Sequence, residues 1–207
     1  MEMKNVKAVI FDCDGVMLDT AQANRVYYSR ILQHFGKPAV TDEQFAFVHM
    51  HTVTDSIAYL FPDKATLAAA HEFRQSMDYS QYLKDLKLEP HLVPLLARLR
   101  PQIKTAIATN RTDTMNRLLA EFNLDGCFDL VVTSSDVKRP KPHPDVLLKI
   151  LNDFDLKSFQ TVYIGGSPVD ETAARAAGIP LVAFRNRELS SDCHIDTLKE
   201  LEVLLNL

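Results

Sequence analysis

Short apolar runs alternate with longer amphipathic segments along this chain, and the alternation predicts its fold. Residues 6–11, Val-Lys-Ala-Val-Ile-Phe, are apolar and partly β-branched, which is typical of a strand buried on both faces. Later runs of the same kind predict four more strands, at residues 103–109, 128–133, 161–165 and 180–184. Helical periodicity predicts the segments between and after them, at residues 91–99, 112–122, 144–154, 168–177 and 195–205. Five strands separated by helices indicate an α/β fold with a doubly wound, parallel, five-stranded Rossmann-like sheet.

The segment from residue 19 to residue 86 breaks this alternation, because it contains helical patterns and no strand. Its four predicted helices cover residues 20–35, 41–48, 53–61 and 63–86, with Thr41 as the expected N-cap of the second. Four consecutive helices after the first strand of an α/β protein indicate a separate module. We therefore predict a core domain of residues 1–18 and 87–207, and a four-helix cap domain inserted at residues 19–86.

Composition places the chain among ordinary globular proteins. Its 207 residues carry a formal charge of -4, with 46% hydrophobic and 24% charged residues, and no basic stripe suggests a nucleic-acid partner. Three widely spaced cysteines favour reduced thiols over a disulfide framework. The first strand leaves no room for a signal peptide, and no apolar run approaches the length of a membrane span. We expect a cytoplasmic protein without a membrane partner, acting as a monomer or homodimer.

Candidate chemistry begins where the first strand ends. Asp12 and Asp14 are separated by one residue, so in an extended chain both side chains point to the same side. Gly15 permits the sharp turn that would follow them. Ligands of α/β sheets bind at the carboxyl ends of the strands, which is where these two acids lie. The alternative is a strand end whose acids only solvate a turn.

Later strand ends and loops add further candidates. Thr109 and Asn110 follow a predicted strand, where a hydroxyl and a backbone N–H suit an anionic oxygen, although a plain helix N-cap is the alternative. Lys141 is flanked by prolines that restrict its loop, so its ammonium suits a phosphoryl group better than a freely solvated lysine would. Asp170 is a further candidate site acid. It lies in the first turn of a predicted helix, so the alternative is that its charge only stabilises the helix N-terminus.

These motifs, in this order around a helical insert, resemble those of the haloacid dehalogenase-like (HAD) phosphohydrolases. Residues 12–16, Asp-Cys-Asp-Gly-Val, match the first family motif, Thr109-Asn110 matches the second, and residues 141–144, Lys-Pro-His-Pro, match the third. Within the superfamily the chain looks most like the phosphoglycolate phosphatase and β-phosphoglucomutase-like branch. In that branch a small helical cap closes over the active site and selects the substrate.

The resemblance implies a role for each matching residue. Asp12 would attack phosphorus and form an aspartyl-phosphate. Asp14, protonated in the closed site, would give its proton to the leaving alkoxide and then act as base for the hydrolytic water. Thr109, Asn110 and Lys141 would hold the phosphoryl oxygens. The implied activity is a phosphatase acting on a small phosphorylated metabolite.

The same resemblance implies Mg²⁺ as cofactor, but the fourth motif departs from the family pattern. Gly166 stands where the family usually has an acid that binds the metal directly, while Asp170 matches the second acid of the motif. The expected metal ligands are therefore Asp12, the main-chain carbonyl of Asp14, and Asp170. Because Mg²⁺ is often held by one or two carboxylates plus substrate phosphate, we expect weakened rather than abolished metal binding.

Other reaction classes compete with this interpretation. A sugar-phosphate mutase would use the same core, and the missing acid at Gly166 favours a non-catalytic, phosphate-binding or regulatory protein. Dehalogenases of the superfamily lack the second acid, so Asp14 argues against that chemistry. His49 and His51 interrupt the cap helices where the family often carries its specificity loop, and we expect them to contact substrate unless they are simply solvent-exposed. Arg74 is a further candidate for an anionic substrate tail.

Overall fold

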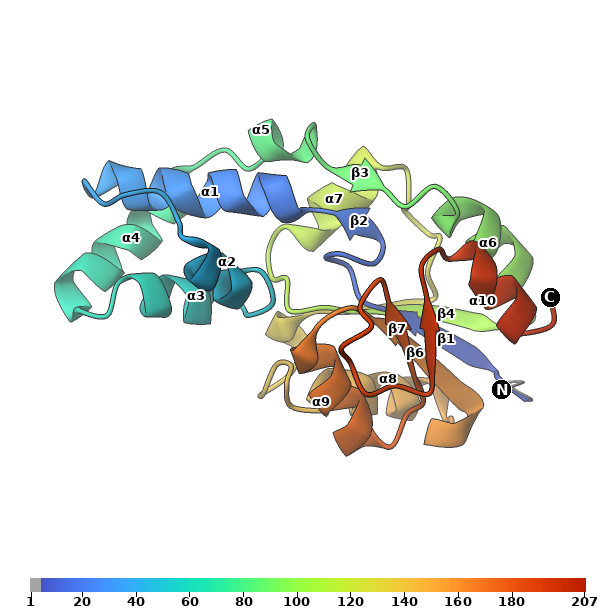
Figure 1. The fold of residues 1–207 in the computed structure, drawn as a ribbon. Helices are drawn as coiled ribbons and strands as arrows, with labels where there is room; N and C mark the ends of the chain where they lie inside the picture. Colours follow the sequence, from blue (N-terminus) through green and yellow to red (C-terminus); the bar gives the residue numbers. More distant parts are fainter. Residues whose placement is uncertain (1–4) are drawn as a thin grey trace.

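The computed structural model of the chain describes residues 5–207 and is built around one parallel β-sheet (Figure 1). The sheet has six strands in the order β5-β4-β1-β6-β7-β8, and every neighbouring pair is parallel. They are β1 (Ala8–Phe11), β4 (Lys104–Ala108), β5 (Leu130–Val132), β6 (Thr161–Gly165), β7 (Leu181–Phe184) and β8 (Cys193–Ile195). Strand β1, whose four residues are all apolar, lies in the interior of the sheet and is fully buried.

Helices cover both faces of the sheet, which confirms the doubly wound α/β fold. One face packs against α8 (Asp145–Phe154) and α9 (Pro168–Ala177), and the short η1 (Ser134–Asp136) and η2 (Ser158–Gln160) lie in the connecting loops. The other face packs against α6 (Leu92–Leu99), α7 (Met115–Glu121) and α10 (Lys199–Leu204). Alternate β1 residues divide between these two cores, with Ile10 in the first and Val9 and Phe11 in the second, as a strand buried on both faces requires.

The sixth strand corrects the sequence-based prediction of five. Strand β8 pairs with β7, with Val182 opposite Cys193 and Phe184 opposite Ile195. The helix predicted for residues 195–205 therefore begins too early, since Ile195 closes a strand and α10 begins at Lys199. Without β8, the outer edge of β7 would present unpaired backbone N–H and C=O groups. Strand β5 is equally short but wholly apolar and was recognised, whereas β8 reads Cys-His-Ile and gives no apolar run in the sequence.

The segment between β1 and α6 is helical and lies beside the sheet rather than on it (Figure 1). Its helices are α1 (Ala21–His34), α2 (Asp42–Val48), α3 (Val53–Leu60), α4 (Lys64–Ser76) and α5 (Ser80–Leu83). The chain enters it through β2 (Leu18–Asp19) and leaves through β3 (Lys87–Leu88), which pair antiparallel with each other. We infer from this arrangement that residues 19–86 form a cap domain joined to the core by two adjacent strands.

The local signals in this segment were only partly readable from the sequence. Thr41 is the N-cap of α2, as predicted, because its Oγ1 accepts a hydrogen bond from the Gln44 N–H at 3.2 Å. The single helix predicted for residues 63–86 is instead two helices. Met77 adopts an extended conformation after α4, and Asp78 accepts bonds from the N–H and hydroxyl of Ser80 at 3.0 and 2.6 Å. Such side-chain to backbone bonds compete with helix continuation.

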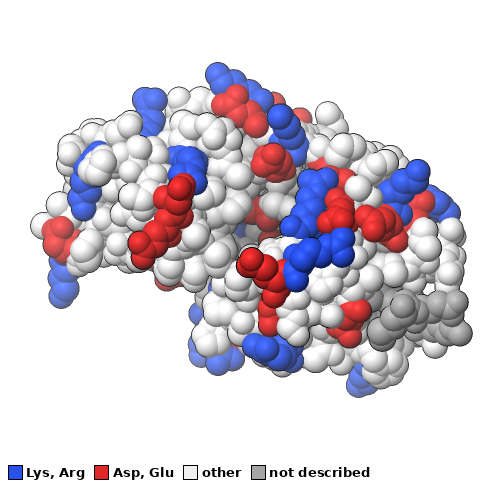
Figure 2. Space-filling model, viewed as in Figure 1, with Lys and Arg blue, Asp and Glu red and all other residues white. Residues whose placement is uncertain are grey.

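A cavity of about 380 Å³ lies between the cap helices and the carboxyl edge of the sheet. Figure 2 shows the surface hollowed between these two parts, with acidic and basic side chains both gathered around the hollow. Among residues 5–207, the helices are all too short or too polar to cross a membrane.

Candidate active site

Strand register brings three of the predicted motifs to one point. Strand β1 pairs with β4 on one side and β6 on the other, so Phe11 lies opposite both Ile107 and Ile164. The residues that follow these positions therefore meet at the carboxyl edge of the sheet. They include Asp12 after β1, Thr109 after β4 and Gly166 after β6. The cavity is lined by Asp12, Thr109 and Gly166.

Lys141 reaches this edge from the loop before α8 and holds two carboxylates together. Its Nζ donates to Oδ1 of Asp12 and to Oδ1 of Asp170, each at 2.7 Å. It also lies 2.9 Å from the hydroxyl of Tyr163 and 3.1 Å from the carbonyl of Ala108. The lysine is 3% exposed, so a buried ammonium bridges the end of β1 and the first turn of α9.

Asp170 is the most completely hydrogen-bonded acid of the site. Its Oδ1 accepts from Lys141 and, at 2.6 Å, from the Tyr163 hydroxyl. Its Oδ2 accepts from the N–H groups of Gly166 and Ser167 at 3.1 and 3.0 Å and from the Ser167 hydroxyl at 2.6 Å. A carboxylate offers about four lone-pair positions, so these five donors leave no oxygen free. Asp170 therefore orients Lys141 and closes the Gly166-Ser167 turn.

The charges of this cluster are strongly coupled. Burial raises the pKa of Asp12 to about 7, with Asp170 adding to the effect and Lys141 opposing it. Burial works against the charge of Lys141, but Asp12 and Asp170 outweigh it and hold the lysine pKa above its usual value. Burial would also raise the pKa of Asp170, yet Lys141 and its hydrogen bonds lower it. The hydrogen bonds and Lys141 thus favour the ionised form of Asp170, whereas the burial of Asp12 favours its protonated form.

Asp14 makes a different ion pair, which the sequence did not reveal. Arg111 donates from Nε to Oδ2 at 2.8 Å and from Nη2 to Oδ1 at 2.7 Å. Burial alone would raise the pKa of Asp14, but the Arg111 guanidinium outweighs it and lowers this pKa to about 2. This pairing favours the carboxylate form of Asp14, whereas the role predicted for Asp14 in the closed site needs the protonated form. Asp14 is ionised as long as Arg111 is paired with it.

Thr109 and Asn110 differ in what they offer to a ligand. The hydroxyl of Thr109 is buried, lines the cavity and accepts the N–H of Arg111 at 3.1 Å, so its own proton remains available to an anion. The side chain of Asn110 is committed to the protein, because its Oδ1 accepts from the Lys141 N–H and its Nδ2 donates to the carbonyls of Lys141 and Met50 at 2.9 and 3.0 Å. Asn110 thus fixes the Lys141 loop and touches the cap.

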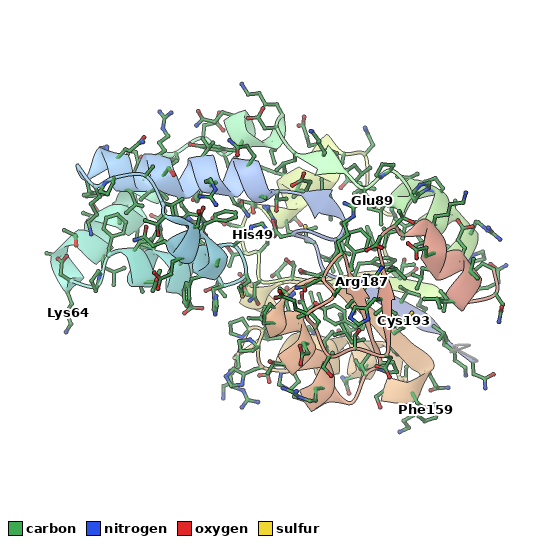
Figure 3. All side chains as sticks on the ribbon, viewed as in Figure 1. His49, Lys64, Glu89, Phe159, Arg187 and Cys193 are labelled. Carbon is green, nitrogen blue, oxygen red and sulfur yellow. The ribbon has the colours of Figure 1, made fainter. Side chains whose placement is uncertain are left out.

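The cap contributes both predicted histidines to the cavity lining. Figure 3 shows His49 on the side of the cap turned toward the sheet domain. Its Nδ1 lies 3.2 Å from Nδ2 of Asn24, which in turn lies 3.4 Å from Asp14. Burial lowers the pKa of His49 despite the opposing charge of Asp14. The ring of His51 stacks on Phe47 with centroids 3.9 Å apart.

Arg74 closes the cap onto the core instead of pointing freely into the cavity. Its Nη2 donates to both carboxylate oxygens of Asp113 at 2.7 Å, and its Nε donates to the Tyr27 hydroxyl at 3.2 Å. Asp113 belongs to the loop before α7, which begins at Met115 rather than at the predicted residue 112. Arg74 therefore ties α4 of the cap to the loop that also carries Arg111.

The residues present can hold Mg²⁺, but with fewer protein ligands than predicted. Within residues 5–207, Lys141 is the one hydrogen-bond donor to the Asp12 carboxylate, and Oδ2 of that acid has no partner. Asp170 has no oxygen to spare and Gly166 has no side chain. In the same part of the chain, no three histidine, cysteine or acidic side chains converge as a metal site. One carboxylate oxygen, the Asp14 carbonyl, substrate phosphate and water remain a donor set that suits Mg²⁺.

Sequence reasoning found the strand-end acids but missed three neighbours. Arg111 follows directly after Thr109-Asn110, so a basic residue beside an expected anion site was a visible signal. Tyr163 is the one aromatic residue of β6, and its hydroxyl reaches Lys141. Asn24 had no local signal, because it is one polar residue among many on α1.

Comparison with known proteins finds a hydrolase family and phosphatase relatives. The model of the haloacid dehalogenase-like hydrolase family matches residues 9–184. A phosphoglycolate phosphatase of Cupriavidus necator is 31% identical over 96% of this chain and 92% of its own length. A Caldanaerobacter subterraneus protein, PpaX, provisionally named a pyrophosphatase, is 29% identical over 87% of this chain and 82% of its own.

The fold is also similar to that of a solved structure from this superfamily. The crystal structure of a HAD-superfamily hydrolase of subfamily IA from Geobacter sulfurreducens superposes with a TM-score of 0.78. The two sequences are 33% identical, and the match covers 97% of each chain. The motifs and the fold of this chain, together with these relatives, show that it belongs to the haloacid dehalogenase-like hydrolase family.

Proposed function

We propose that the protein is a Mg²⁺-dependent phosphatase that hydrolyses a small phosphorylated metabolite through an aspartyl-phosphate intermediate. The observation that carries the proposal is the position of Asp12, which lines the cavity and whose carboxylate accepts, among the donors of residues 5–207, only Lys141, at 2.7 Å. A buried ammonium beside a carboxylate neutralises charge where a phosphoryl group would approach. The phosphatases named among the relatives support this reaction class.

The chain's own residues supply each step of the proposed reaction. The free oxygen of Asp12 attacks phosphorus in line, and the leaving alkoxide departs opposite to it. Lys141, the Thr109 hydroxyl and the main-chain N–H of Asn110 hold the phosphoryl oxygens. Once Arg111 has released it and it has taken up a proton, Asp14 gives that proton to the alkoxide and, as a carboxylate again, takes a proton from the water that hydrolyses the aspartyl-phosphate. When bound, Mg²⁺ would neutralise phosphoryl charge beside Asp12 and the Asp14 carbonyl.

The test is release of inorganic phosphate from an aryl phosphate, measured across a Mg²⁺ titration from zero upward. Saturable, metal-dependent release supports the proposal. The competing function is a non-catalytic phosphate-binding protein, which Gly166 and the fully hydrogen-bonded Asp170 favour. Phosphate binding without any turnover, both for the aryl ester and for a panel of phosphorylated metabolites, would establish that alternative.

The effect of Gly166 on the affinity for Mg²⁺ is testable by placing an acid at this position. A side chain at Gly166 is a tight fit, because its Cβ would lie 3.3 Å from the Phe184 carbonyl oxygen and 3.8 Å from Val16, so the Phe184 backbone has to shift by a few tenths of an ångström. We expect Gly166→Asp to lower the half-saturating Mg²⁺ concentration about tenfold, since added ligand charge tightens binding of a hard cation. Gly166→Asn is the matched control of similar volume and should leave that concentration unchanged. Calorimetry with Mg²⁺ and phosphate measures both, and equal values for the two variants would contradict the expectation.

The two cap histidines are proposed substrate contacts. Loss of one hydrogen bond to a substrate is worth about 0.5–1.5 kcal/mol, so His49→Ala and His51→Ala should each lower kcat/KM up to about tenfold. His71→Ala on α4 is the control, because His71 does not line the cavity. Steady-state kinetics on the best substrate of a phosphometabolite panel decide the matter. Unchanged kcat/KM for every substrate in both variants would exclude the histidines as contacts.

A further inference from the structure

Four basic side chains line the cavity, and each one is paired with an acid. The pairs are Arg74 with Asp113, Arg111 with Asp14, Lys141 with Asp12 and Asp170, and Arg185 with Glu89. Three of these cations can keep an acidic partner throughout the proposed reaction. Arg111 cannot, because its partner is the acid that must meet the leaving group.

The pairing opposes that meeting. Each Asp14 oxygen has two lone pairs, but a guanidinium bound to both oxygens favours the carboxylate, whereas the leaving group needs an acid that carries a proton. Arg111 binds both carboxylate oxygens of Asp14, and Asn24 approaches one of them at 3.4 Å. A leaving-group oxygen can take a proton from Asp14 only if it reaches one of these two oxygens. Arg111 therefore has to release Asp14 before the proposed reaction can begin.

Once released, the guanidinium needs another anion. The Arg111 side chain is only 7% exposed, and a buried charge without a partner is strongly unfavourable. Its other contacts are neutral hydroxyls, Tyr79 at 2.8 Å and Thr114 at 3.1 Å. The nearest other acid of its loop, Asp113, is already bound through both oxygens by Arg74. Within residues 5–207, no further acid forms an ion pair with Arg111.

We propose that Arg111 determines substrate specificity by binding a second anionic group of the substrate, a carboxylate or a second phosphate, next to the scissile bond. The assignment rests on the proposed phosphatase function. The planar guanidinium fork that now binds a carboxylate matches either group in two-point fashion. The second group must lie close to the leaving oxygen, because Arg111 and that oxygen share Asp14. The substrate class is thus small phosphate esters or anhydrides with an adjacent acidic group.

The experiment compares three substrates that differ in the group beside the scissile bond. Phosphoglycolate carries a carboxylate, pyrophosphate a second phosphate, and ethyl phosphate only a methyl. We expect kcat/KM of the wild type to favour at least one of the first two over ethyl phosphate by about 100-fold or more, and the preferred one identifies the group. Arg111→Gln should reduce the preference to within about tenfold, and Arg111→Lys, which keeps the charge without the fork, should lie between.

The control variant is Arg139→Gln, which removes an exposed arginine paired with Asp145 outside the cavity. It should keep the wild-type preference. Equal turnover of all three substrates by the wild type, or a preference that survives Arg111→Gln, would overturn the Arg111 proposal and leave the phosphatase function intact.

A binding measurement decides the proposal even if no phosphate ester is hydrolysed, an outcome that would overturn the phosphatase function itself. Calorimetry compares phosphonoacetate and methylenediphosphonate, which carry the second anion, with ethylphosphonate, which does not. At least about tenfold tighter binding of a doubly anionic ligand, lost in Arg111→Gln, supports the role of Arg111. Equal affinities, or no binding of any of the three, would overturn it.

Discussion

Replacing Asp12 by Asn is expected to reduce phosphate-ester turnover by at least about 10³-fold, because an amide cannot attack phosphorus in place of the carboxylate. The side chain keeps its size and its contact with Lys141, so the loss would report on chemistry. Phosphate release gives the rate, and incorporation of labelled phosphate into acid-quenched protein reports the aspartyl-phosphate. Labelling should occur in the wild type and vanish in Asp12→Asn. Turnover within tenfold of wild type would exclude Asp12 as the nucleophile.

The thermal stability of Asp12→Asn shows separately whether this variant is folded. The pKa of Asp12 is about 7 in the folded protein against an ordinary value of 3.8, so the folded state holds this proton more tightly than the unfolded state. The wild type therefore loses stability as pH rises from about 4 through about 7. An asparagine side chain does not titrate, so the Tm of Asp12→Asn should rise relative to wild type over that range, by about 2–4 °C for each 1 kcal/mol gained. Thermal melts in EDTA at pH 4, 6 and 8 measure this difference.

Removing the ammonium of Lys141 is expected to cost both stability and activity. Lys141→Met keeps much of the length of the side chain but leaves Asp12 and Asp170 buried without their shared cation. Breaking a buried ion pair from one side typically costs about 3–5 kcal/mol. The two acids can take up protons at low pH, so the loss should be larger at pH 8 than at pH 5. Urea unfolding at the two pH values measures it, and phosphate release should fall below detection.

Two further variants separate charge from packing in the lysine result. Lys138→Met removes an exposed lysine of the same loop and should change neither stability nor activity. Lys141→Met combined with Asp12→Asn removes one of the two unpaired carboxylates and should recover part of the lost stability without restoring turnover. If the double variant is as unstable as Lys141→Met alone, the cost lies in packing rather than in unpaired charge.

Much of this site was readable from local sequence, for reasons of backbone geometry. An apolar run followed by two acids and glycine identifies a buried strand and its ligand edge without knowledge of any partner strand. Thr109 was recognised in the same way, by its position after an apolar strand. The prolines around Lys141 indicated a restricted loop, and the lysine is indeed held in place by Asp12 and Asp170.

The contacts that change the chemistry were not readable, because they join residues far apart in the chain. Arg111 and Asp14 are separated by 97 positions, and no periodicity links them. Their ion pair favours the carboxylate form of Asp14, whereas the sequence-based expectation for the closed site is a protonated acid. The ion pair between Arg74 and Asp113 depends likewise on how α4 packs against the loop before α7, which local propensity does not encode.

The sequence by itself determined the α/β alternation, the helical insert and the strand-end motifs, since each depends on side-chain spacing within a few residues. Only the tertiary structure decided the sixth strand, because β8 exists by pairing with β7. It also decided that Asp170 accepts five hydrogen bonds and that Arg111 forms an ion pair with Asp14. The charge state and free lone pairs of a buried acid depend on which distant groups packing brings within hydrogen-bond reach.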